Sequence, residues 1–295
     1  MPAGLLESLF AVIAPVFIAA ALGYGWAKKG WPMDTAMITR LVTLIGTPAL
    51  VLHTLLSVEL SPAALGHMAL IAATAMISMA ILSLIVMRLA GWPISGYLPS
   101  MVFANVGNMG LPLCLFAFGQ QGLAFAIAYF TVGSVCQFVF GPAAASGRLE
   151  IKAVLKTPII WAIALAVALM IGGIALPKWA ENTLSLMGGM SIPLMLLMLG
   201  ISLGKLTMAG MGRCLGLSVL RLAGGFAIGL GVCEIFGLEG VERGVVLIQT
   251  SMPVAVFNYL FAVLHDNRPS DVAGMVLLST LLSFATLPFL LAYVL

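Results

Sequence analysis

Hydrophobic residues along this 295-residue chain form long runs, and short groups of charged residues, glycines and prolines separate these runs. A run of about 20 apolar residues is long enough to cross a bilayer as a helix. Backbone groups that face lipid must be hydrogen-bonded within the segment, so each run is predicted to be helical. The pattern predicts ten membrane-spanning helices, at residues 8–27, 37–57, 66–90, 97–119, 122–142, 157–176, 183–203, 213–236, 243–263 and 271–294.

Composition agrees with an all-α membrane protein. Hydrophobic residues make up 62% of the chain and charged residues 8%, whereas soluble domains carry about 25% charged residues. No polar stretch is long enough for a separate soluble domain, so residues 1–295 are predicted to form one membrane domain. The net charge of +3 comes from residues scattered at span ends, which gives no indication of nucleic-acid binding. The four cysteines form no CxxC pair, and neither a metal site nor a cofactor is predicted.

The distribution of basic residues predicts the orientation. Cytoplasmic loops carry an excess of Lys and Arg. The loop set that includes both termini holds only Lys178 and Arg243. We therefore expect a multi-pass protein of the inner (plasma) membrane with both termini on the outer, periplasmic side. The cytoplasmic loops would then hold Lys28, Lys29, Arg40, Arg88, Arg148, Lys152, Lys156, Lys205, Arg213 and Arg268.

Prolines recur at one spacing along the chain. Those of the first half precede those of the second by 141–146 residues, which predicts two five-helix repeats, residues 1–145 and 146–295. Five is an odd number of crossings, so the second repeat would enter the membrane from the opposite side, as in many transporters. The pairs are Pro15 and Pro158, Pro48 and Pro193, Pro112 and Pro253, and Pro142 and Pro288.

Two spans carry unusually polar, helix-breaking segments at equivalent positions of the two halves. Proline removes a backbone donor and glycine lowers the cost of unwinding, so spans four and nine are predicted to be broken, with Pro starting each second half-helix. In an inverted repeat the positive helix ends would converge near the midplane and bind a carboxylate. Ligand-free kinked helices with interhelical amide bonds are the alternative. The candidate site residues are Asn105, Gly107, Asn108, Gly110, Pro112, Gln249, Thr250, Ser251, Pro253 and Asn258.

These segments carry a family resemblance. Residues 105–113, the Ser251-Met252-Pro253 break and the closing segment from Ser279 to Pro288 resemble the auxin efflux carrier family of plant auxin exporters and bacterial permeases for malonate, malate and similar acids. The resemblance implies ten spans, with the fourth and ninth broken and crossing. It also implies a core of spans 3–5 and 8–10 that moves like an elevator against a scaffold of spans 1, 2, 6 and 7, which often forms a homodimer. The expected partners are therefore a small organic anion, the lipid bilayer and a second copy of the chain.

Several alternatives remain open from the sequence. A related sodium-coupled organic-anion symporter shares the architecture, although no sodium-binding carboxylate is evident, and an anion channel can also contain inverted repeats. An enzyme is not expected, because the chain has no HExxH pair, GxSG-like nucleophile or deep aspartate pair. Arg221 is either functional or extends to the cytoplasmic surface. His53 either relays protons or packs as a hydrogen-bonded side chain.

Overall fold

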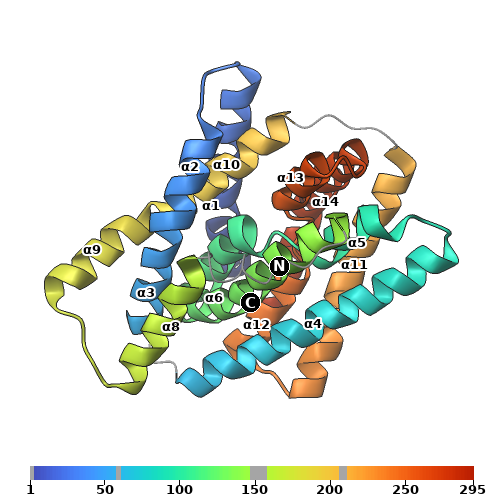
Figure 1. The fold of residues 1–295 in the computed structure, drawn as a ribbon. Helices are drawn as coiled ribbons and strands as arrows, with labels where there is room; N and C mark the ends of the chain where they lie inside the picture. Colours follow the sequence, from blue (N-terminus) through green and yellow to red (C-terminus); the bar gives the residue numbers. More distant parts are fainter. Residues whose placement is uncertain (1–2, 58–60, 147–157, 206–210) are drawn as a thin grey trace.

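The computed structural model describes residues 3–57, 61–146, 158–205 and 211–295 (Figure 1). Three basic residues used to predict the orientation, Arg148, Lys152 and Lys156, lie outside this part of the chain. The described residues form helices and no strand. The α-helices are α1 (Ala3–Lys28), α2 (Thr35–Leu41), α3 (Thr47–Ser57), α4 (Pro62–Leu89), α5 (Ile94–Val102), α6 (Leu111–Ser146), α8 (Pro158–Ile171), α9 (Lys178–Gly189), α10 (Ser191–Lys205), α11 (Met211–Phe236), α12 (Gly240–Thr250), α13 (Val256–Leu264) and α14 (Pro269–Val294), and two π-helices are η1 (Val42–Gly46) and η2 (Val106–Gly110).

An all-helical membrane protein is confirmed at this coarse level. Within the described ranges, seven helical segments are long and apolar enough to cross a bilayer. The other predicted spans correspond to helices that are short or interrupted: α8 has 14 residues, and the pairs α5–η2 and α12–α13 are each divided. Helix α6 also changes direction at Gly119, whose φ of 64° is accessible to glycine at little cost. Ten crossings and an inverted repeat therefore remain predictions.

The helices pack in two groups (Figure 1). In one group α1 lies along α10, and α3 packs against α8 and α9. In the other group α11 packs against α14, α4 and α12, and α6 lies between α4 and α12. The first group contains predicted spans 1, 2, 6 and 7, and the second contains spans 3–5 and 8–10, which is the division that the family resemblance implies.

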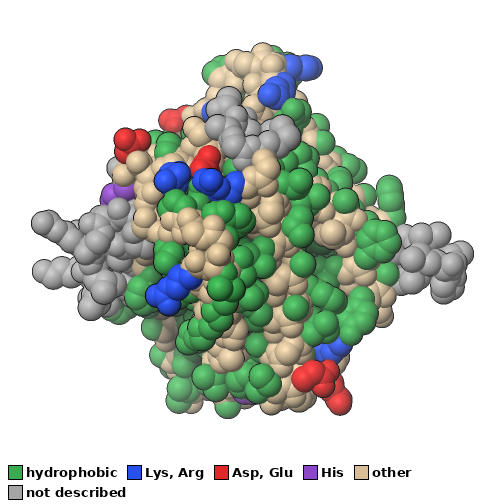
Figure 2. All heavy atoms as spheres, turned by 90° about the vertical axis from the view of Figure 1, so that its right-hand side faces the viewer, with side chains coloured by type: hydrophobic (Ala, Val, Ile, Leu, Met, Phe, Trp, Pro, Cys, Tyr) green, Lys and Arg blue, Asp and Glu red, His purple; other side chains and the backbone are tan. Residues whose placement is uncertain are grey.

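Apolar side chains cover much of the outer surface. On α4, Ile77, Ile81 and Ile85 are exposed at intervals of four residues, so they follow one face of the helix. Figure 2 shows hydrophobic side chains over much of one face of the molecule, with charged side chains mainly toward its upper and lower ends. Lipid is the solvent that suits such a surface.

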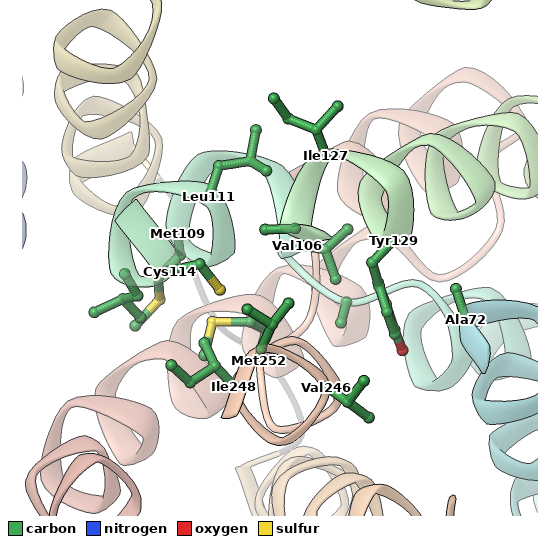
Figure 3. Packing of buried hydrophobic residues seen from close by; sticks show 14 of the residues in the cluster. Ala72, Val106, Met109, Leu111, Cys114, Ile127, Tyr129, Val246, Ile248 and Met252 are labelled. Carbon is green, nitrogen blue, oxygen red and sulfur yellow. The ribbon is translucent and has the colours of Figure 1, made fainter. Parts of the chain in front are cut away.

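The centre of the second group is tightly packed. Met109 of η2 and Cys114 of α6 lie opposite Ile248 of α12 and Met252, the second residue after α12 (Figure 3), and all four side chains are fully buried. Interiors packed this closely resist small displacements. The packing therefore fixes η2 and the end of α12 relative to each other, and these two elements form the site described next.

Both π-helices end two residues before a proline. Gly46 of η1 precedes Pro48, and Gly110 of η2 precedes Pro112. A proline inside a helix has no N–H and its ring crowds the preceding turn, and a π-turn is one way to accommodate this disruption. The two prolines thus widen the turn before them without ending the helix.

Candidate functional site

The interruption between α5 and η2 lies directly beside the interruption between α12 and α13. Their backbones form an isolated antiparallel bridge. The Asn105 N–H donates to the carbonyl of Pro253 at 2.7 Å, and the Ala255 N–H donates to the carbonyl of Phe103 at 3.1 Å. Backbone groups released by breaking two helices are thus partly satisfied by each other, as an apolar environment requires.

The position of the half-helices corrects one prediction. We expected Pro112 and Pro253 each to start a second half-helix, but η2 begins at Val106, and Pro112 lies inside the helical segment that follows. Pro253 lies in the second interruption, and α13 begins only at Val256. The physical reason is that the non-helical residues are those whose backbones pair across the two breaks. This pairing between distant segments fixes where each helix stops.

Side chains from neighbouring helices stabilise the two breaks. The Asn258 Nδ2 donates to the Phe103 carbonyl at 2.9 Å, and the Gln137 Nε2 donates to the Asn258 Oδ1 at 3.3 Å. On the other side, the Ser279 Oγ accepts from the Val254 N–H at 3.0 Å. Asn258 therefore supports the first break from the helix that follows the second. The sequence had suggested Asn258 as a ligand-binding residue, and a binding role stays a prediction.

A cavity of about 680 Å³ lies between the two helix groups. The N-terminal ends of η2 and α13 border it, and a helix N-terminus carries about half a positive charge. Among the described residues that line it, the charged ones are the basic Arg40 and Lys205, and none is acidic. Among the predicted site residues, Asn105, Gly107 and Asn108 line this cavity.

Asn105 is the polar side chain best placed to meet a ligand. It is 4% exposed, and within the described part of the chain its Nδ2 has no hydrogen-bond partner. It precedes η2, yet its side chain makes no capping hydrogen bond to that helix. A buried amide without a partner carries a desolvation cost, which a ligand acceptor in the cavity would remove.

The remaining predicted site residues are buried behind the cavity wall. A Cβ at Gly110 would overlap the Oε1 of Gln249, so glycine is required for these segments to approach so closely. The Gln249 Nε2 donates to the Ala126 carbonyl at 3.4 Å, and the Thr250 Oγ1 donates within its own helix to the Val246 carbonyl at 2.8 Å. The structure brings these residues together at the crossing, but the following do not line the large cavity: Gly110, Pro112, Gln249, Thr250, Ser251, Pro253 and Asn258.

The sequence analysis missed a row of threonines on the opposite wall. Thr35, Thr39, Thr43 and Thr47 all line the cavity, and their regular spacing of four residues was visible in the sequence. In an α-helix of 3.6 residues per turn, each step of four residues drifts by about 40°. The π-helix η1 has a wider turn, which opposes this drift and helps to keep the four hydroxyls on one wall.

Two residues left open by the sequence analysis differ in their placement. Arg221 is 3% exposed, and its Nη2 donates to the Thr250 carbonyl at 2.9 Å, so it does not extend to the surface. His53 is half-buried and lines neither the large cavity nor the smaller one described below. Ser134 and Gln137 of α6, which share one helix face, do border the large cavity.

Known proteins resemble much of the chain. The sequence model of a family described as membrane transport protein matches residues 144–291. An uncharacterized transporter of Methanocaldococcus jannaschii is 25% identical over 209 residues, which cover 67% of this chain and 68% of the relative. An uncharacterized transporter of Methanothermobacter thermautotrophicus is 27% identical over 194 residues, which cover 62% of this chain and 63% of the relative.

Proposed function

The chain belongs to the membrane transport protein family, the family of the auxin efflux carriers, and we propose that it is a secondary transporter that carries a small organic anion across the inner membrane. The family resemblance of the sequence is thereby confirmed. The expected substrate class is a carboxylate such as malonate, malate or an auxin-like acid. Binding and release would require no covalent chemistry from the protein.

The observation that carries this proposal is the arrangement around Asn105. Its buried amide lies beside two helix N-termini in a cavity whose described charged lining residues, Arg40 and Lys205, are both basic. A carboxylate would accept a hydrogen bond from this amide and would be stabilised by the positive ends of the two helices. It would also be attracted by Arg40 and Lys205 at the surface end of the same cavity.

The large cavity also supports an elevator-type mechanism of alternating access. Its walls come from both helix groups: α2, η1 and α10 on one side, and η2, α6 and α13 on the other. Movement of the second group against the first would carry a bound anion with it, because Asn105 and both helix N-termini belong to the moving group. We propose that the first group is the scaffold and forms a homodimer.

The cavity provides an orientation as well. Arg40 and Lys205, which line it, are among the residues predicted to face the cytoplasm from the excess of basic residues in those loops. The proposed state is therefore inward-facing. The proposed topology has ten crossings in two inverted repeats (residues 1–145 and 146–295), with both termini outside.

A ligand screen with a site variant tests the proposal. The thermal unfolding of the purified protein is measured with mono- and dicarboxylates and indole acids. At least one acid is expected to raise the unfolding temperature, because a ligand that binds only the folded state stabilises it. Asn105→Ala should weaken the binding of that acid by about 10- to 100-fold, as expected for the loss of a hydrogen bond to a charged group.

The matched control is Asn182→Ala, which removes the same amide from an exposed position on α9. This variant should bind the acid as the wild type does. Uptake of the acid into liposomes should saturate and be competed by unlabelled acid, whereas a channel would show neither property. The proposal is wrong if no acid stabilises or is transported, and the site lies elsewhere if Asn105→Ala binds as tightly as the wild type.

A further inference from the structure

Arg221 lies beside the helix crossing, where it contacts the end of α12, and it does not line the large cavity. A small cavity of about 20 Å³, room for about one water molecule, is lined there by Arg221, Thr250, Phe103, Gln137 and Tyr129. No described lining residue is acidic. A buried guanidinium without a carboxylate partner is costly unless other groups offset its charge.

The ends of two helices supply that compensation. Helix α5 ends at Val102 and helix α12 ends at Thr250, and both residues line the small cavity with Arg221. Each helix C-terminus carries about half a negative charge. The Thr250 carbonyl, one of the last of α12, accepts directly from the Arg221 Nη2 at 2.9 Å.

The contact depends on a close approach between helices. A Cβ at Gly225, one turn after Arg221 on α11, would overlap the Thr250 carbonyl oxygen. Glycine at this position lets α11 lie against the end of α12, so that the guanidinium can reach the crossing. The C-terminal ends of α5 and α12 thus border the small cavity with Arg221, whereas Ala104 and Val106, at the start of η2, line both cavities.

We propose that Arg221 is the resident cation of the crossing: its fixed charge neutralises the two converging C-terminal helix ends and holds the crossing in its anion-binding geometry without a bound metal cation. Arg221 is a positioning residue, because it lines the small cavity and not the large one. If the chain binds an anion, as the function proposed above requires, that binding should not need sodium, because Arg221 already supplies the positive charge. The neutralisation itself does not depend on the substrate.

Substitutions that separate charge from volume test this role. Arg221→Lys keeps the charge, Arg221→Met keeps most of the volume, and Arg221→Ala removes both. We expect Lys to preserve the unfolding temperature best, and Met and Ala to lower it. If Met is as stable as the wild type, the guanidinium is only a packing group and the proposal is wrong.

Chemical rescue gives the readout that a packing role would not produce. Guanidinium chloride at a few millimolar should raise the unfolding temperature of Arg221→Ala, while choline chloride at equal ionic strength should not. The wild type should respond to neither salt. Arg88→Ala, in which an exposed arginine of α4 is removed, is the matched control and should show no rescue. Failure of guanidinium to rescue a folded Arg221→Ala protein would overturn the proposal.

Sodium dependence completes the test and separates the two proposals. Malonate, or another acid that stabilises the wild type, should bind equally well in sodium and in choline buffers, and Arg221→Met should bind it at least tenfold more weakly in both. If the wild type binds the acid only in sodium, the proposed role of Arg221 is wrong, but the proposal of an anion transporter remains supported. If no acid binds the wild type but guanidinium rescues Arg221→Ala, the proposed role of Arg221 is supported and the proposal of anion transport is wrong.

Discussion

The contact between Gly110 and Gln249 gives the sharpest stability prediction. Gly110 is buried in η2 and Gln249 is fully buried in α12, and a Cβ added at residue 110 would overlap the Gln249 Oε1. Gly110→Ala therefore forces a buried side chain to move within a close-packed region. Overpacking of this kind costs about 1–3 kcal/mol, and the gain in helix propensity returns up to about 1 kcal/mol.

The expected net loss is about 1–2 kcal/mol, which lowers the unfolding temperature by roughly 2–3 °C for a chain of this size. Gly107→Ala is the matched control from the same π-helix. Its Cβ would meet the ring edge of Phe130 at 2.8 Å, and Phe130 lines the large cavity, so the ring has space to move. Gly107→Ala should change the unfolding temperature by less than about 1 °C and affect anion binding instead.

A double-mutant cycle identifies the cause. If the clash with Gln249 is responsible, Gly110→Ala should cost much less in a Gln249→Ala background, because the obstructing side chain is gone. The expected favourable coupling is about 1 kcal/mol or more, measured by thermal unfolding in detergent. Additive effects of the two substitutions, or a Gly110→Ala protein as stable as the wild type, would refute the reasoning.

Two further predictions follow from polar contacts. Asn258→Ala should lower the free energy of unfolding by about 1 kcal/mol, because the Phe103 carbonyl loses the Asn258 donor but keeps the Ala255 N–H. Thermal unfolding measures this change, and a loss above about 4 kcal/mol would mean that the break collapses. Arg40→Gln should raise the substrate concentration for half-maximal uptake by about two- to fivefold at low salt and have little effect at high salt, because salt screens the attraction between exposed charges. The control is Lys178→Gln, on a helix that does not line the cavity, and it should have no effect under either condition.

The coarse architecture was predictable because lipid imposes a simple rule. Hydrophobic runs had to be helical, and the described segments are helical. The position of the unusual segments was also predictable, since glycine, proline and amides gather around Asn105 and Ser251. The sequence alone therefore indicates where the two helices are weak and which residues weaken them.

The start of each half-helix could not be predicted in the same way. Pro112 and Pro253 are the strongest local helix breakers in the two segments, yet neither begins a helix. A proline destabilises a helix over a whole turn, and the backbone bonds between the two breaks decide which residues leave it. Those bonds join residues about 150 positions apart in the chain, so no local pattern contains them.

The division of the site residues between cavity wall and interior has the same origin. Asn105 and Asn258 are both buried amides at the crossing, but Asn258 uses its side chain to hold the Phe103 carbonyl, whereas the Asn105 Nδ2 has no partner among the described residues. In sequence, both residues look like candidate ligands. An amide whose donor is already used can contribute less to binding than an amide whose donor is free, so Asn105 is the residue on which the proposed anion site would depend.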